Sequence, residues 1–503
     1  MSGVTTRLPS RSAARLVAWL LGLVVVGALC SVAVARPGGG QSYSGGGHSY
    51  SGGSHSSSGG GGYSGGGYSH SSSSGGGGGS FSPGAAAGLL IGFGIMVLIL
   101  MLASSGNERT YTTAFTAPSA PPPIDLAPIL ERDPDFSRVA FEDFVYRLYA
   151  AAQRARHNKP ELAKLTPYFG PGALSVMERR TTRIEQVVIG NLRIVEASID
   201  QDAASRSKLV VAVEANLAGP AGTTNVSERW TFVRDPGVKT RPPEHTRTLS
   251  CPNCNSPFTK GEDTRTCGHC GTTINVGQFD WTVYAINVDA ETSVGYTLTG
   301  TVEEVGNDFP TLTEPQVQET LMKLRNDDAN VTWDAFTARV TMIYSRLNDA
   351  WNAQDLTPVR GLVTSSLLQY LQFWIDEYKR QQLANKLEQP KLSYIKLAKV
   401  TRDKWYDAIT VRVYAEGFDF TIDKNGSTVG GSKDDRRSYT EYWTFLRSSA
   451  RRGPITTTPS CPNCGAPLAI SNTGDCTHCS AQIENASFDW TLSKIEQDDI
   501  YRG

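Results

Sequence analysis

The chain has 503 residues, a formal net charge of −1 and 39% hydrophobic residues. Because binding to duplex nucleic acid requires clustered positive charge, this balance argues against nucleic acid as a partner. The first 123 residues contain one acidic residue, Glu108, and almost all remaining charge lies after Pro123. We therefore expect the globular part of the protein to follow residue 123.

Residues 1–35 are expected to form a signal peptide or a first transmembrane helix. Arg7, Arg11 and Arg15 precede an uncharged apolar run over 16–35 that ends in Ala-Val-Ala, a pattern typical of a cleavage site. The run is longer than the ~7–15 residues of a signal core and matches the ~20 residues of a spanning helix. Cleavage and retention therefore both remain open.

Residues 36–83 are expected to be a disordered linker. They are mainly Gly and Ser with almost no charge, so they cannot bury a core. His48, His55 and His70 allow a metal-binding interpretation, and we favour the simpler one, a solvated linker.

Residues 84–103 form a second uncharged apolar run, which predicts a transmembrane helix. The alternative is a buried core helix, but no domain surrounds the run. A Pro-rich polar tether follows over 104–128. Because the N-terminal arginines should remain in the cytoplasm, the second run returns the chain to that side. The domains after it are expected to face the cytoplasm.

The remainder of the chain contains one unit twice. Four short landmarks recur in the same order, including Trp-Thr-Phe-(Val/Leu)-Arg and Phe-Asp-Trp-Thr. The matching pairs are residues 230–234 with 443–447, 250–254 with 460–464, 267–270 with 476–479, and 279–282 with 488–491. Four landmarks in order indicate an internal repeat. We place the two domains at 129–290 and 326–498, with an interdomain linker at 291–325.

Each unit is expected to contain helices first and strands after them. In the first, helices are predicted over 141–155, starting near Ser137, and over 173–188, with strands at 187–199, 207–217, 225–234 and 278–288. In the second, helices are predicted over 333–351 and 367–387, with strands at 391–400, 404–416, 436–447 and 486–496. On the first helix, Phe141, Phe144, Val145 and Leu148 share one face. Helices followed by antiparallel strands indicate two tandem α+β domains.

The cysteines predict two structural zinc ions. Eight of the nine form the patterns C-x2-C-x12-C-x2-C and C-x2-C-x11-C-x2-C: Cys251, Cys254, Cys267 and Cys270, then Cys461, Cys464, Cys476 and Cys479. Four thiolates saturate a tetrahedral ion, so these zinc ribbons, at 250–272 and 460–481, should be structural. Gly271 and Gly465 allow positive φ beside the turns.

Two alternatives to this zinc assignment remain. One is two disulfides per group, and the other is a Cys3His site that uses His269 or His478, which we expect to be solvated. Thiolate zinc also agrees with a reducing, cytoplasmic compartment.

Residues 335–371, AFTARVTMIYSRLNDAWNAQDLTPVRGLVTSSLLQYL, carry a family resemblance. With their aromatic first helix, Ala350-Trp351 and Asp355-Leu356, they resemble the C-terminal domain of the mitochondrial inner-membrane translocase subunit 44 and its bacterial relatives. Residues 160–174 occupy the same place in the first unit. The resemblance implies a cone of helices against a curved antiparallel sheet, similar to nuclear transport factor 2. It also implies a tether at the bacterial inner membrane that binds a lipid or a membrane protein.

We therefore expect a membrane-anchored, non-catalytic binding or scaffold protein. Lipid binding and assistance in membrane-protein transport or assembly are its candidate roles, and the oligomeric state stays open. The alternative is a small-molecule enzyme that uses Asp280 and Asp489, which occupy the same place in each unit and could act as general bases. The simpler interpretation of both is an outward-facing residue on a strand. Arg179, Arg180 and Arg183 are a candidate lipid-facing patch or the solvated face of a helix. Each cone is expected to present an apolar cavity or groove lined by some of its aromatic residues, such as Phe373, Trp374, Trp405, Tyr406 and Trp443.

Overall fold

The computed structural model describes residues 124–200, 205–241, 282–296 and 306–455, short stretches within 251–281, 298–304 and 460–479, and most of 489–503. The expected signal or membrane segment at 1–35, the linker at 36–83 and the expected transmembrane helix at 84–103 lie outside the described residues. Most of the tether also lies outside them. Within the described ranges, no helix is both long enough and apolar enough to cross a membrane.

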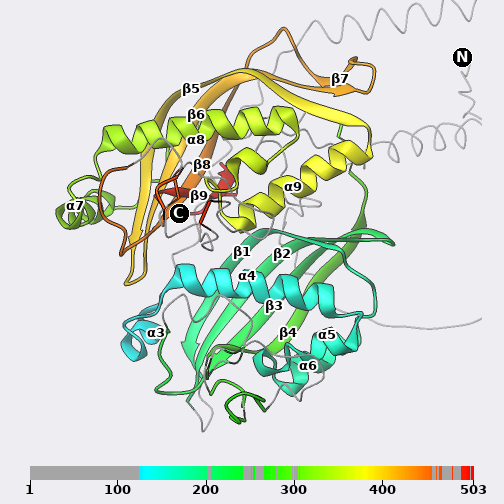
Figure 1. Cartoon of the computed structure of the whole chain (residues 1–503), viewed down its shortest axis with the longest axis vertical. Helices are drawn as coiled ribbons and strands as arrows, with labels where there is room; N and C mark the ends of the chain where they lie inside the picture. The colour runs from blue at the N-terminus through cyan, green and yellow to red at the C-terminus, as the bar shows by residue number, and fades with distance from the viewer. Residues whose placement is uncertain are drawn as a thin grey trace, which may run out of the picture. The chain divides into compact units, whose positions relative to one another are not determined.

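The first lobe, residues 124–294, packs helices against one four-stranded antiparallel sheet. The helices are α3 (Ala127–Arg132), α4 (Arg138–Ala155), α5 (Lys159–Ala163) and α6 (Pro171–Glu178), with a 3-10 turn at Thr166–Tyr168. The strands are β1 (Gln186–Ile199), β2 (Ser207–Gly219), β3 (Gly222–Arg234) and β4 (Thr282–Val294), in the order β1-β2-β3-β4. Figure 1 shows α4 lying across one face of this sheet.

The second lobe, residues 317–503, has the same plan, with longer first two strands and a short additional strand. Its helices are α7 (Val317–Asp327), α8 (Trp333–Ala353) and α9 (Ser365–Arg380), with a 3-10 turn at Thr357–Val359. Its strands are β5 (Leu383–Arg402), β6 (Tyr406–Asp423), β7 (Thr428–Gly431), β8 (Arg437–Ser448) and β9 (Thr491–Gln497), in the order β5-β6-β8-β9 with β7 on β6. Both lobes are therefore α+β with antiparallel sheets, as the sequence predicts (Figure 1).

The two sheets correspond residue by residue, because strand register aligns them. Trp230 of β3 lies opposite Ile286 of β4, and Trp443 of β8 lies opposite Ile495 of β9. A bulge follows at the same place in both lobes, between Thr231 and Phe232 and between Thr444 and Phe445. A bulge is a specific local feature of strand pairing. Its recurrence fixes which residue of one lobe matches which residue of the other.

The cores of the two lobes also correspond. Phe141 of α4 contacts Phe232 and Trp281 with ring centroids 5.4 and 5.2 Å apart, and Phe336 of α8 contacts Phe445 and Trp490, both at 5.5 Å. Trp230 and Trp443 each donate their indole N–H to a buried glutamate two residues earlier, Glu228 at 2.8 Å and Glu441 at 2.9 Å. The predicted apolar face of the first helix, Phe141, Phe144, Val145 and Leu148, is buried.

Each lobe also buries an arginine against an aspartate and a tryptophan. Arg234 pairs with Asp133 at 2.8 Å and lies 4.5 Å above the ring of Trp281. In the second lobe, Arg447 pairs with Asp328 at 3.0 Å and lies 4.7 Å above Trp490. The arginine of the repeated Trp-Thr-Phe motif is therefore a core residue that ties the sheet to the chain just before the first long helix.

Helix starts follow the capping chemistry of the sequence, and helix ends do not follow its apolar pattern. Ser137 accepts a hydrogen bond from the Ala140 amide, as expected for an N-cap, and Thr332 does the same for Ala335. The predicted helix over 367–387 is wrong at its end, because α9 stops at Arg380 and 383–387 begin β5. Gln382 has φ +57, and the Leu387 amide donates to the side-chain oxygen of Asn352 at 2.8 Å.

The end of α6 and the position of α7 differ from the sequence predictions. The predicted helix over 173–188 is wrong after residue 178, where α6 ends, and its last residues belong to β1. Helix α7 lies partly inside the segment expected to be a linker, and its Val317, Leu321 and Leu324 join the core of the second lobe. These three residues are spaced i, i+4 and i+7, a helical period that the assignment of 291–325 as a linker overlooked.

The segment between the lobes is fastened to the outer face of the second sheet. The guanidinium of Arg412 donates to the carbonyls of Gly306 at 2.9 Å and Phe309 at 2.6 Å, and pairs with Asp498 at 2.8 Å. Arg412 and Asp498 have side chains 1% and 3% exposed. Gly306 has φ +101, and a Cβ there would lie 2.6 Å from the Cβ of Asp498, so the close approach requires glycine.

The two lobes fall within one compact unit and touch through α4. Glu142 of α4 binds Lys494 of β9 at 3.1 Å and Arg138 at 2.7 Å. One turn further along the same stripe, the hydroxyl of Tyr146 donates to the Ser366 carbonyl of α9 at 3.3 Å, and about two turns beyond Tyr146, Arg154 contacts Gln369 at 3.4 Å. The outward stripe of α4 is therefore covered by the β9 and α9 edge of the second lobe.

Candidate metal centre

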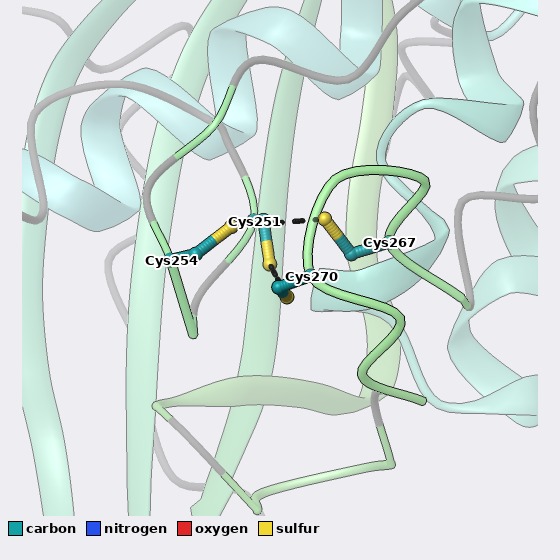
Figure 2. Close-up of side chains that lie close together, drawn as sticks. All are labelled: Cys251, Cys254, Cys267 and Cys270. Carbon is teal, nitrogen blue, oxygen red and sulfur yellow. Dashed lines mark hydrogen bonds between the residues drawn. The ribbon is translucent and has the colours of Figure 1, made fainter.

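The first four predicted ligands meet at one point. The sulfur atoms of Cys251, Cys254, Cys267 and Cys270 all lie within 4.8 Å of one another. Figure 2 shows the two pairs approaching from two separate loops with their sulfurs turned toward a common centre. Cys251 and Cys270 are 3.9 Å apart, and Cys254 and Cys267 are 3.7 Å apart, measured between sulfurs.

These separations fit a shared metal ion and not a disulfide. Four thiolates at ~2.3 Å from a tetrahedral zinc ion lie ~3.8 Å from one another. A disulfide would bring two sulfurs to ~2.0 Å. All four cysteines are free thiols in this structure. For this first set, the geometry therefore contradicts the disulfide alternative.

Local turns bring each pair of sulfurs together. The amide of Cys251 donates to the Ser256 carbonyl at 2.9 Å, and the amide of Gly271 donates to the Cys267 carbonyl at 2.8 Å. Gly271 has φ +66, which confirms the positive φ expected there. An antiparallel bridge between Thr266 and Thr273 closes the second turn.

The environment of the four thiols is uneven. Burial raises the pKa of the Cys251 thiol to about 12. Hydrogen bonding by Thr272, whose hydroxyl lies 3.3 Å from the sulfur, lowers the pKa of the exposed Cys270 to about 5. The side-chain amide of Asn253 donates to the same sulfur at 3.5 Å. These polar neighbours, which sequence reasoning missed, are placed to stabilise a thiolate on the open side of the site.

The second set repeats this geometry as far as it is described. The sulfurs of Cys461, Cys464 and Cys479 lie within 4.8 Å of one another, and Cys461 and Cys479 are 3.7 Å apart. Cys476 lies outside the described residues. The Gly465 amide donates to the Cys461 carbonyl at 2.7 Å, and Gly465 has φ +72. The first turn of the second set therefore matches the turns of the first.

Histidine is not part of the described sulfur clusters. His269 and His478 are both exposed, as expected, and neither belongs to the groups of side chains close enough to share an ion. A set of four thiolates leaves no coordination position for water or substrate. Such a site stabilises a fold and does not activate a nucleophile.

The two repeated aspartates lie just before their strands and accept hydrogen bonds from the backbone there. Asp280 binds Arg241 at 2.7 Å and accepts the amide of Trp281 at 2.8 Å. Asp489 accepts the amide of Trp490 at 2.8 Å and is 5% exposed. Neither is the outward-facing strand residue that the sequence suggested, because both precede their strands and cap the backbone of the buried tryptophan that follows.

The buried contact of Arg180 contradicts the expected arginine patch. Its guanidinium pairs with buried Glu228 at 2.8 Å and is 16% exposed, so it reaches the core. Arg179 contacts Ser175, and Arg183 pairs with Glu185. The three arginines therefore point to three different partners and do not form one surface patch.

The tryptophans and phenylalanine expected near a cavity mostly fill the core. Phe373, Trp374 and Trp443 are 4%, 3% and 2% exposed. Trp405 is half-buried, and its indole N–H donates to the Asp135 carbonyl of the first lobe at 3.1 Å. An apolar groove that is described lies elsewhere, on the outer side of α8.

Comparison with known proteins identifies part of the chain. Residues 317–455 match the family model of the Tim44-like domain, from the first residue of α7 to just beyond β8. This confirms the resemblance for the second lobe. The Tim44-like match does not extend into the first lobe, whose likeness to the second rests on the shared register and contacts.

No curated protein matches the chain. Among solved structures, 24 chains match. One is described as an Ntf2 like protein involved in plasmid conjugation. It is 9% identical, covers 71% of this chain and 93% of its own, and superposes with a TM-score of 0.17. A superposition of that quality carries no conclusion about this protein.

Proposed function

We propose that this protein is a membrane-anchored, non-catalytic scaffold made of two related lobes, each stabilised by one structural zinc ion. The observation that carries the proposal is the contrast between its two repeated sets of reactive side chains. The cysteines meet at metal-binding distances, whereas the aspartates are used to cap strands. Both repeated sets of reactive side chains therefore have a structural role in this proposal.

The first lobe is proposed to be a second Tim44-like domain. Shared strand order, the shared bulge and the matching buried Arg–Asp–Trp groups support a duplication. Each cysteine set lies in the chain between the last two strands of its sheet. In such a protein the lobes supply surfaces, and each metal ion would hold together the cysteine-bearing turns between those strands.

The membrane part of the proposal rests on the sequence. The apolar run at 84–103 would anchor the chain, and the N-terminal arginines would leave the lobes in the cytoplasm. The expected partner is a membrane protein or a lipid of the bacterial inner membrane. A cytoplasm-active reporter fused after Gly503 should be active, whereas an export-dependent reporter fused there should be inactive.

Zinc content tests the metal centres directly. The full-length chain, purified in detergent under reducing conditions, should contain two zinc ions, and Cys251→Ser should contain one. Cys30→Ser is the matched control, because Cys30 stands outside both sets and its loss should leave both ions. Finding no zinc in the unaltered protein would reject the metal assignment.

The scaffold role is tested by affinity purification from solubilised membranes. We expect the full-length protein to retain a membrane protein or a lipid, and Asp280→Asn or Asp489→Asn to retain the same partner. An enzymatic turnover that disappears in both aspartate variants while the fold is retained would replace the scaffold with the enzyme alternative.

A further inference from the structure

An open groove runs along the outer stripe of α8. Its volume is 730 Å³, and its lining residues all come from that helix. Trp333 and Met342 are half-buried in its floor, and Ala338 and Thr341 are exposed. The hydroxyl of Thr337 is buried there with no hydrogen-bond partner among the described residues. The accessible lining of the groove is mostly apolar, its charged members are Asp334 and Arg346, and it contains one unsatisfied polar atom.

The equivalent stripe of the first lobe is already an interface. The N-caps Ser137 and Thr332 and the core pairs Phe141 and Phe336 align α4 with α8. In this alignment Thr337 matches Glu142, which binds Lys494, and Thr341 matches Tyr146, which binds α9. The stripe that receives the second lobe on α4 is thus the stripe that forms the open groove on α8.

The surface that would fill such a groove is also exposed on this chain. The α4 stripe is covered by β9 and the start of α9, and their counterparts in the first lobe are β4 and the start of α6. By strand register, Lys494 matches Ala285. Beside Ala285, Tyr284 is 51% exposed, and Pro171 and Gly172 at the start of α6 are exposed as well. We call Tyr284, Ala285 and the start of α6 the β4 rim.

The two free surfaces are chemically suited to each other. Where α4 and β9 meet through the charged pair Glu142–Lys494, the α8 groove and the β4 rim would meet through Thr337 and Ala285, both small and uncharged. Trp333 and Met342 would lie near exposed Tyr284, and burial of apolar area would favour contact. The two charged lining residues of the groove, Asp334 and Arg346, lie on either side of Thr337 along α8.

We propose that the β4 rim of one chain docks into the α8 groove of a second copy, which continues the contact that joins the two lobes within each chain. The contact is heterologous, because groove and rim are different surfaces. Each chain presents one of each, so association is head-to-tail and can extend beyond a dimer.

Complementation between two variants tests this geometry. The full-length chain in detergent should form concentration-dependent species larger than a dimer by light scattering. Ala338→Arg blocks the groove, Tyr284→Arg blocks the rim, and each should weaken association at least tenfold. An equimolar mixture of the two should recover a dimer and nothing larger, because one intact groove and one intact rim remain. Met322→Arg is the control, since Met322 is 56% exposed on α7 and outside both surfaces.

A charged pair introduced across the contact tests its register. Thr337→Glu and Ala285→Lys should each weaken association, and the double variant should restore it by recreating the Glu142–Lys494 pair between chains. Recovery by mixing or by the double variant also shows that the variants fold. A monomer at every concentration would overturn the proposal and assign the groove to another segment or another protein. A dimer unaffected by Tyr284→Arg would overturn it in favour of a symmetric contact.

Discussion

The two lobes share an interior and differ at their outer faces. Both bury a tryptophan bonded to glutamate and an arginine paired with aspartate, in the same register. On the outer face of the first sheet, Arg229 pairs with Asp289 in a contact 52% and 35% exposed. At matching places in the second sheet, Tyr442 stacks on Tyr501 at 3.8 Å and Asp498 pairs with buried Arg412. The interior therefore sets the fold, and the outer faces distinguish the lobes.

The outer face of the second sheet is covered, so breaking its Arg412–Asp498 pair should cost more stability than breaking the exposed Arg229–Asp289 pair. An exposed pair remains solvated whether or not it forms, so its net contribution is small. A buried charge that loses its partner bears the cost of desolvation alone. Arg412 also satisfies carbonyls of the interdomain segment, so the second lobe depends on a contact that the first lobe lacks.

The largest expected contrast is between substitutions of Arg412 and of Arg229. Arg412→Met should destabilise the second lobe by about 3–5 kcal/mol, because it leaves Asp498 buried without its partner. It should also release residues 306–312, seen as faster amide hydrogen exchange. Arg229→Met should leave the denaturation midpoint unchanged. Equal effects of the two substitutions would contradict the assignment of different outer faces.

The contact between the lobes should weaken in acid. Burial acts to raise the pKa of Glu142, but Lys494 and Arg138 together outweigh it and lower that pKa to about 2. A lowered carboxyl pKa gives stability that is present above the unfolded value of ~4.3 and is lost as pH falls toward 2. Burial raises the pKa of nearby Glu496, which acts in the opposite direction.

Glu142→Gln isolates this effect. The variant should be less stable than the unaltered protein by about 1–2 kcal/mol at pH 6, discounted because Lys494 is 45% exposed. The difference should disappear as pH falls from about 4.5 to 2, followed by denaturant unfolding. Asp143→Asn, next along α4 in an exposed pair, is the control and should show no such trend. A difference that persists at pH 2 would exclude the charged contact as its cause.

The smallest expected effect is the loss of stability on removal of a helix N-cap, which should be similar in the two lobes. Ser137→Ala and Thr332→Ala each remove the N-cap of the first long helix, at a cost of about 1 kcal/mol. Thermal unfolding of the full-length chain should show similar shifts for both. The matching Thr→Ser substitution at Thr332 should restore most of the loss. A large difference between the lobes would mean that the two helix starts are not equivalent.

Helix ends and covered faces could not be predicted from the sequence, for identifiable reasons. The apolar period of 367–380 continues into 383–387, so only the left-handed Gln382 and the contacts of Leu387 end the helix. Arg180 lies beside other charges in the sequence, and nothing local shows that it reaches Glu228. Asp280 and Asp489 are carboxylates next to tryptophan, and only the folded backbone shows that each accepts a hydrogen bond from the amide of that tryptophan.

The sequence by itself determined the repeat, the α+β order of elements, the cysteine sets and the start of each long helix. These depend on patterns within a few residues: period, capping chemistry and C-x2-C spacing. Tertiary structure alone decided which charged residues are buried, what the interdomain segment contacts, and why the α4 stripe is covered while the α8 groove is open. Those outcomes depend on residues more than a hundred positions apart, such as Glu142 and Lys494 or Arg412 and Gly306, and no local pattern records such pairs.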